Sequence, residues 1–181
     1  MISRIVIPSI RPVLKPQDVV LALYLTGTPA RTQSEIAGQV GLSQGEVSNA
    51  LKRLRASRLL LDDARTIVVP HLVELCVHGI KYVFPAEVGR KVGGMPTVAL
   101  APPLAGNIFG EEAELVWPSP RGTARAASLE PLHPCVVHAA ERDERLYQLL
   151  SLLDGIRVGR ARLREVAEKK FRDILMGSPC S

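Results

Sequence analysis

The residues with the clearest chemical character lie between Ser43 and Arg58. This segment holds four Lys or Arg residues and one acidic residue, Glu46. At about 100° per residue, a helix here places four apolar side chains on one side: Val47, Ala50, Leu51 and Leu54. The opposite side and its flanks carry small, amide-bearing and basic residues: Gly45, Ser48, Asn49, Lys52, Arg53 and Ala56. Amides and cations of this kind hydrogen-bond to base edges and phosphates, and small residues allow a close approach.

Two start signals predict the helices that position this surface. Thr32-Gln-Ser-Glu35 and Ser43-Gln-Gly-Glu46 both match the capping box, in which a hydroxyl and a carboxylate satisfy the first backbone amides of a helix. The first helix is expected to run to about Val40 and the second to about Ser57. Between them, Ala37 is small enough for a close helix crossing, and Gly41 tolerates a turn with positive φ. The spacing is that of a helix-turn-helix unit.

The elements on either side extend this unit. Pro16 suits the first position of a short, mostly buried helix over 18–25, which Gly27 and Pro29 end. After the second motif helix, two short strands, 59–61 and 66–69, flank a polar tip and predict a β-hairpin. Over about residues 16–70 the sequence therefore resembles the winged helix-turn-helix proteins, as in MarR-like bacterial transcriptional regulators.

That resemblance implies binding to double-stranded DNA, with the helix that opens at Ser43 in the major groove and the hairpin near the flanking backbone. The helix geometry assigns base contacts to four residues: Gln44, Ser48, Asn49 and Lys52. Phosphate contacts are expected from six residues: Arg31, Thr32, Ser43, Arg53, Arg55 and Arg65. Arg4 and Arg11, on a proline-rich arm, could enter a minor groove.

After residue 70 the sequence predicts a helix, then a proline-rich stretch, and then two further helices. A helix is expected from His71 to about Val83. Residues 85–135 contain eight prolines and predict strands only at 97–101 and 114–117. Four leucines then recur with helical spacing: Leu146, Leu149, Leu150 and Leu153. Gly155 is expected to end that helix, and a last one covers 158–176.

These elements predict a mainly α-helical fold with small β elements, an α+β protein. We expect an extended arm (1–15), a winged helix-turn-helix domain (16–83), a proline-rich, short-stranded middle region (84–137) and a C-terminal helical region (138–177). The DNA-binding unit closes its core without the four leucines at 146, 149, 150 and 153, which we call the leucine stripe. We therefore expect the leucine stripe to form the dimer interface, with residues 85–135 as the alternative.

Composition limits the classes of protein. The 181 residues are 46% hydrophobic and 23% charged, which favours a packed core over disorder. No apolar run approaches the roughly 18 residues of a membrane span, and the N-terminus does not resemble a signal peptide. Three widely spaced cysteines indicate no disulfide framework, so we expect a cytoplasmic protein. Of the net charge of +5, most lies in residues 1–65, where 9 Lys or Arg face 5 Asp or Glu.

Other candidate sites carry weaker signals. Two groups of His and Cys residues, His71/Cys76/His78 and His133/Cys135/His138, hold enough ligand atoms for zinc but match no standard spacing. Gly89–Gly94 is glycine-rich and basic but lacks the Lys-Ser/Thr ending of a phosphate-binding loop, and a flexible surface loop is the better interpretation. Arg157, Arg160, Arg162 and Arg164 are expected to form ion pairs with Glu141, Asp143 and Glu144, with contact to DNA as the alternative. We expect no metal, no cofactor and no enzymatic activity.

The sequence-based hypothesis is a cytoplasmic, sequence-specific DNA-binding regulator that acts as a homodimeric repressor on a two-fold operator. One helix contacts too few base pairs for specificity, and two helices on half-sites about one turn apart would supply it. The alternative is an antitoxin or adaptor that binds a partner protein through its C-terminal two-thirds, with or without autoregulatory DNA binding. The irregular middle region motivates this second hypothesis.

Overall fold

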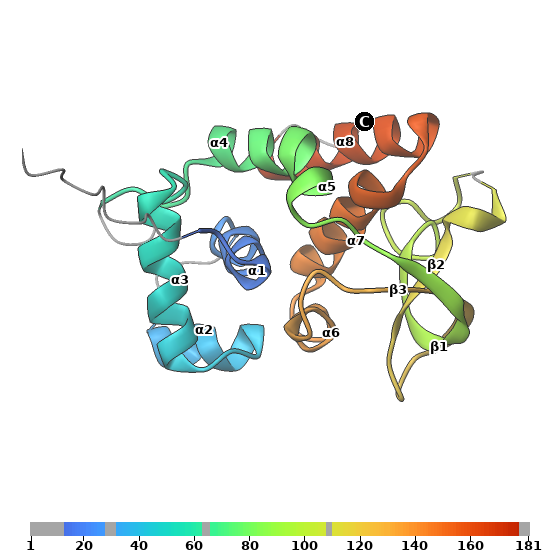
Figure 1. Cartoon of the computed structure of the whole chain (residues 1–181), viewed down its shortest axis with the longest axis horizontal. Coiled ribbons are helices and arrows are strands. Elements are labelled where there is room, and N and C mark those ends of the chain that lie inside the picture. Colours follow the sequence, from blue (N-terminus) through green and yellow to red (C-terminus); the bar gives the residue numbers. More distant parts are fainter. Residues whose placement is uncertain (1–12, 28–31, 63–65, 108–109, 178–181) are drawn as a thin grey trace, which may run out of the picture.

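The computed structural model describes residues 13–27, 32–62, 66–107 and 110–177. Three helices open the described chain: α1 (Pro16–Leu25), α2 (Gln33–Val40) and α3 (Gln44–Ala56). Both α2 and α3 pack against α1, and α3 lies at one edge of the molecule (Figure 1). The predicted helices are confirmed, including both capping boxes and the turn at Gly41, which has φ +75°.

The predicted hairpin is much smaller than expected. It consists of a single bridge between Leu60 and Ile67, with Leu61 N–H donating to Thr66 and Val68 N–H donating to Leu59. The second expected strand is cut short because α4 (Val69–Glu74) begins at Val69, with Pro70 in its first turn. Helical backbone then continues through a π-helical segment, Leu75–Gly79, into α5 (Ile80–Val83), which confirms the helix expected from His71 to Val83.

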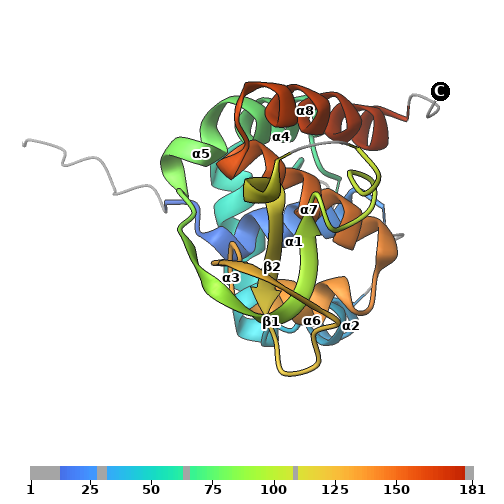
Figure 2. The same ribbon diagram turned by 90° about the vertical axis from the view of Figure 1, so that its right-hand side faces the viewer.

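The proline-rich region forms a small three-stranded sheet: β1 (Val88–Val98), β2 (Glu114–Pro118) and β3 (Ala124–Leu129). Every strand pairs with both of the others, so the sheet closes on itself as a barrel, which lies in front of the helices in Figure 2. β1 is antiparallel to both partners, and Gly94 is the residue where it passes from β3 to β2. A short helical turn, Glu111–Ala113, precedes β2.

The strand β1 corrects two expectations. Gly89–Gly94 is part of a strand and not a surface loop, and the strand predicted at 97–101 ends at Val98. Glycine is used here because the chains approach closely: a Cβ at Gly94 would collide with the backbone of Trp117, and one at Gly122 with the backbone of Gly94. The strand at 114–117 is confirmed to within a residue.

Three helices complete the chain: α6 (Cys135–Ala140), α7 (Glu144–Val158) and α8 (Ala161–Met176). Helix α6 was not foreseen, and it crosses the predicted boundary between residues 137 and 138. It packs against α2, while α7 packs against α1 and α8 against α4. Buried side chains from all the larger elements therefore form one continuous apolar cluster, which confirms an α+β fold with its core between the N-terminal helices and the barrel.

The leucine stripe of α7 is not the dimer surface that the sequence suggested. Its four leucines are at most 2% exposed and pack inside the chain. Gly155 does not end α7 either, because its bare Cα is buried against α8 and the barrel: an added Cβ would lie 3.1 Å from the Cβ of Ala167. Among the helices of the described residues, none has the length and hydropathy that crossing a membrane requires.

Candidate nucleic-acid interface

The first turn of α3 is closed by a capping box between Ser43 and Glu46. The hydroxyl of Ser43 accepts from Glu46 N–H at 3.2 Å and donates to the Glu46 carboxylate at 2.7 Å, and Ser43 N–H donates to the same carboxylate at 2.8 Å. These bonds lower the pKa of Glu46, with the Ser43 backbone amide as the largest cause. The one acidic side chain of the helix is thereby engaged in its cap.

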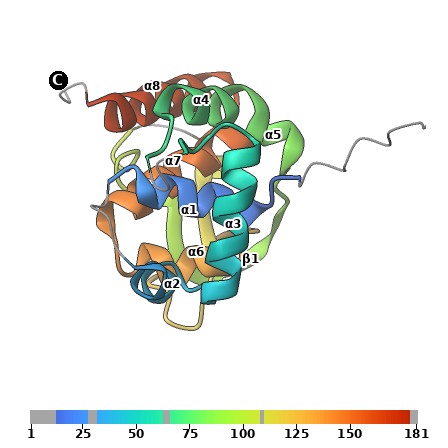
Figure 3. The same cartoon turned by 90° about the vertical axis from the view of Figure 1, so that its left-hand side faces the viewer.

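The exposed and buried sides of α3 agree with the helical pattern. Val47, Ala50, Leu51 and Leu54 are buried, and five residues on the far side are exposed: Gln44, Gly45, Asn49, Lys52 and Ala56. Ser48 is half-buried at the flank. Figure 3 shows α3 in front of α1, with one side of the helix turned away from the other elements. We call the surface formed by Gln44, Ser48, Asn49 and Lys52 the α3 polar face.

Arg53 occupies a different place from the one predicted. Its Nε donates to Asp18 Oδ2 at 2.7 Å and its Nη2 to Asp18 Oδ1 at 2.6 Å, a two-pronged ion pair between α3 and the first turn of α1. The Asp18 side chain is fully buried and that of Arg53 is 12% exposed. The bonds to Asp18 raise the pKa of Arg53. This ion pair argues against the predicted phosphate contact from Arg53, because its guanidinium would give up bonds to a buried carboxylate in turning toward DNA.

Thr32 and Ser43 are exposed, but their hydroxyls are already used. Each hydroxyl accepts from a backbone amide and donates its single proton to a glutamate: Thr32 to Glu35 at 2.9 Å and Ser43 to Glu46. A hydroxyl has only one proton to donate, so a phosphate contact from either side chain would break its bond to the capping glutamate. The structure thus assigns both residues to helix capping.

Of the remaining predicted phosphate contacts, only Arg55 lies in the described part of the chain. Arg55 lies half-buried in the last turn of α3. Arg31 and Arg65 lie outside the described residues, as do Arg4 and Arg11. Of the ten predicted contact residues, the four of the α3 polar face lie on one helix, three of them exposed and Ser48 half-buried at the flank.

Asp18 is the residue of this region that sequence reasoning missed. It is the third residue of α1, where its carboxylate also accepts from Lys15 N–H at 2.8 Å in a further capping arrangement. The sequence signal was present: an acid in an otherwise apolar helix, and an arginine at the edge of the apolar side of α3. Only the packing of α1 on α3 shows that the two meet.

The His and Cys groups do not form a metal site in the described part of the chain, where no three potential ligands come together. His71 bonds to Arg58 O, His138 to Gly38 O, and His133 accepts from Cys135 N–H. Burial raises the pKa of both Cys76 and Cys135, the latter to about 12, so these thiols remain protonated and unreactive at neutral pH.

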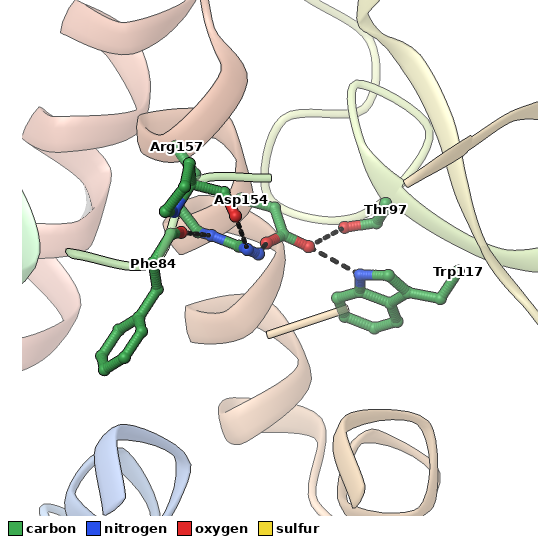
Figure 4. Close-up of polar contacts among 6 residues, drawn as sticks. Phe84, Thr97, Trp117, Asp154 and Arg157 are labelled. Atoms are coloured by element: carbon green, nitrogen blue, oxygen red, sulfur yellow. Dashed lines mark hydrogen bonds and ion pairs between the residues drawn. The ribbon is translucent and has the colours of Figure 1, made fainter. Parts of the chain in front are cut away.

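A second buried ion pair, Asp154–Arg157, lies within α7 (Figure 4). Buried charged residues can form a functional site, but the hydrogen bonds of this pair go to other groups of the protein. Asp154 accepts from Trp117 Nε1 and Arg157 Nη1, both at 2.6 Å, and from Thr97 at 3.4 Å. Arg157 also donates to the carbonyls of Phe84 and Pro85. Burial raises the pKa of Asp154, opposed by Arg157 and the three donors. With its partners supplied from α7, β1 and β2, this carboxylate ties the barrel to the helices.

Helix α3 therefore presents the amide side chains of Gln44 and Asn49 and the cation of Lys52 to solvent. Comparison with known proteins finds no family model that matches the chain, no similar curated protein and no similar solved structure.

Proposed function

We propose that this protein binds double-stranded DNA in a sequence-specific manner through the α3 polar face and regulates transcription as a repressor. The observation that carries the proposal is the exposed side of α3, which carries Gln44, Asn49 and Lys52 and whose one acidic residue, Glu46, is engaged in the helix cap. An Asn side chain can bond to adenine through two hydrogen bonds, and Lys can bond to guanine or phosphate.

The support for α3 favours the same function. A helix that contacts bases must be held in a fixed orientation, because small displacements lose the paired hydrogen bonds. Here the Arg53–Asp18 pair fixes α3 on α1, and the Ser43–Glu46 cap fixes its first turn. Gly45 and Ala56, on the exposed side, leave room for the walls of a groove.

The proposal includes a homodimer, since two copies of α3 would cover two half-sites. The leucine stripe is inside the chain, so the contact must use other residues. Tyr82 and Val83 are 76% and 53% exposed, and their adjacency in the chain makes them the best candidates for that contact. Light scattering of the purified chain should give twice the mass of one copy, and Tyr82→Ser should lower it. A monomer at every concentration would leave this surface to the second candidate function, an adaptor for a partner protein.

Selection from a random duplex library with the full chain tests the proposed function. We expect enrichment of one motif, arranged as two halves about 10 base pairs apart. The same selection with Asn49→Ala should relax the preference at one position of each half while keeping the others. A library that shows no enrichment after repeated rounds contradicts the proposal.

A further inference from the structure

A cavity of about 540 Å³ lies between the barrel and the start of α8, away from α3. Its apolar wall comes from three parts of the chain: Val88 and Ala127 from the sheet, Ala113 from the turn before β2, and Val158 and Leu163 from α7 and α8. The volume is that of a typical small-molecule site. Apolar walls of this kind favour a hydrocarbon or aromatic body.

Three charged side chains line the same cavity. Arg160 Nη1 lies 3.1 Å from Glu112 Oε1, so these two charges largely offset one another. Arg162 also lines the cavity and forms no ion pair with any described residue. The lining therefore carries one net positive charge. The arginines did not pair with Glu141, Asp143 or Glu144 as the sequence suggested.

The backbone adds to this positive potential. Helix α8 has 16 residues, and its first turn has no acidic residue and no side-chain cap from the described part of the chain. The amides of a first turn carry partial positive charge, and arginines there raise the local potential further. An uncapped, arginine-bearing helix start is unfavourable by itself and is stabilised by an anion.

We propose that this cavity is a binding site for a small organic monoanion with an apolar body, such as a medium-chain carboxylate. The carboxylate bonds to Arg162 and to the first amides of α8, and the hydrocarbon lies against Val88, Ala127 and Leu163. One net positive charge in the lining favours a single negative charge over a polyanion. Helix α8, whose first turn lines the cavity, also packs on α4.

Isothermal titration calorimetry with ligands that share one chain and differ in head group tests the proposal. The probes are octanoate, octanol and octyltrimethylammonium. We expect octanoate to bind once per chain, octanol about tenfold more weakly, and the cation not at all. Arg162→Gln should weaken octanoate about tenfold and leave octanol unchanged, because it removes one charge-assisted hydrogen bond.

Two further variants separate this cavity from general surface binding. Lys169→Gln removes an exposed charge from α8 outside the cavity and should keep the octanoate affinity of the unaltered chain. Ala127→Leu fills the apolar wall and should abolish binding of both octanoate and octanol. Equal affinities for octanoate and octanol, or an unchanged octanoate affinity in Arg162→Gln, would overturn the proposal. None of these readouts involves DNA, so the proposed function can fail while this site stands.

Discussion

Arg53 and Asp18 form a buried, two-pronged ion pair that joins the C-terminal half of α3 to the N-terminus of α1. The carboxylate meets the guanidinium through both of its oxygens and also caps α1 through Lys15 N–H. Arg53 therefore helps to fix the orientation of α3, and with it the α3 polar face, on α1. Its contribution to DNA binding would be to position α3 and not to contact phosphate.

Arg53→Ala should destabilise the fold by about 3–5 kcal/mol, because it leaves the fully buried Asp18 carboxylate without its counter-charge. Urea denaturation followed by circular dichroism measures the loss. Arg53→Ala combined with Asp18→Ala should cost clearly less than the sum of the two single changes. Additive losses in this double-mutant cycle would show that the ion pair does not couple the helices.

Asp154→Asn should cost a similar amount, about 3–5 kcal/mol, since Arg157 would keep its buried charge without a carboxylate. The nearby indole of Trp117, which bonds to Asp154, should report the change as a shift in fluorescence in the folded state. Urea denaturation with both fluorescence and circular dichroism checks this. A loss below about 1 kcal/mol would contradict the view that Asp154 joins the barrel to the helices.

Gly41 and Gly45 lie only four residues apart and should respond in opposite ways to alanine. Gly41→Ala places a side chain at φ +75°, and its Cβ would lie 2.7 Å from Cδ2 of His138, so we expect a loss of about 2 kcal/mol or more. Gly45→Ala meets no atom within 4 Å and should stabilise α3 by about 0.5–1 kcal/mol. Thermal melts of the two variants form a matched pair. Equal effects would contradict the left-handed turn at Gly41.

The Ser43–Glu46 cap predicts an acid-dependent loss of stability. The pKa of Glu46 is held below its ordinary value of 4.5, chiefly by the backbone amide of Ser43. A carboxylate whose pKa is lower in the folded state contributes stability that is complete above pH 4.5 and is lost as the pH falls through the folded-state value. Glu46→Gln should therefore flatten the decline in melting temperature below pH 4.5. Parallel curves for the two proteins would show that the cap does not form.

The sequence predicted the N-terminal helices well because their signals are local. The boxes at Thr32 and Ser43 mark helix starts within four residues, and Gly41 marks the turn within one. The sides of α3 follow from periodicity alone. Asp18 could not be assigned to Arg53 in this way, because 35 residues separate the pair and only the crossing of α1 and α3 brings them together.

Predictions for the middle and C-terminal regions were wrong where a local signal had a long-range cause. Gly94 and Gly155 are usual markers of a loop and of a helix end, but in this fold they are places where chains approach closely. The leucines of α7 correctly predicted a helix but not the surface that buries it. Periodicity shows only that the stripe must be covered, and the barrel, α1 and α8 cover it within the same chain.

The most direct test of the account is an equilibrium titration of the duplex enriched by selection, followed by fluorescence anisotropy at several salt concentrations. The unaltered chain should bind tightly, Asn49→Ala should lose about 1–3 kcal/mol, and Lys52→Ala should bind more weakly with a salt slope reduced by about one. Lys169→Gln, on α8, should bind with the affinity of the unaltered chain. If Asn49→Ala and Lys52→Ala both bind as the unaltered chain does, the α3 polar face is not the DNA-binding surface and the proposed function is wrong.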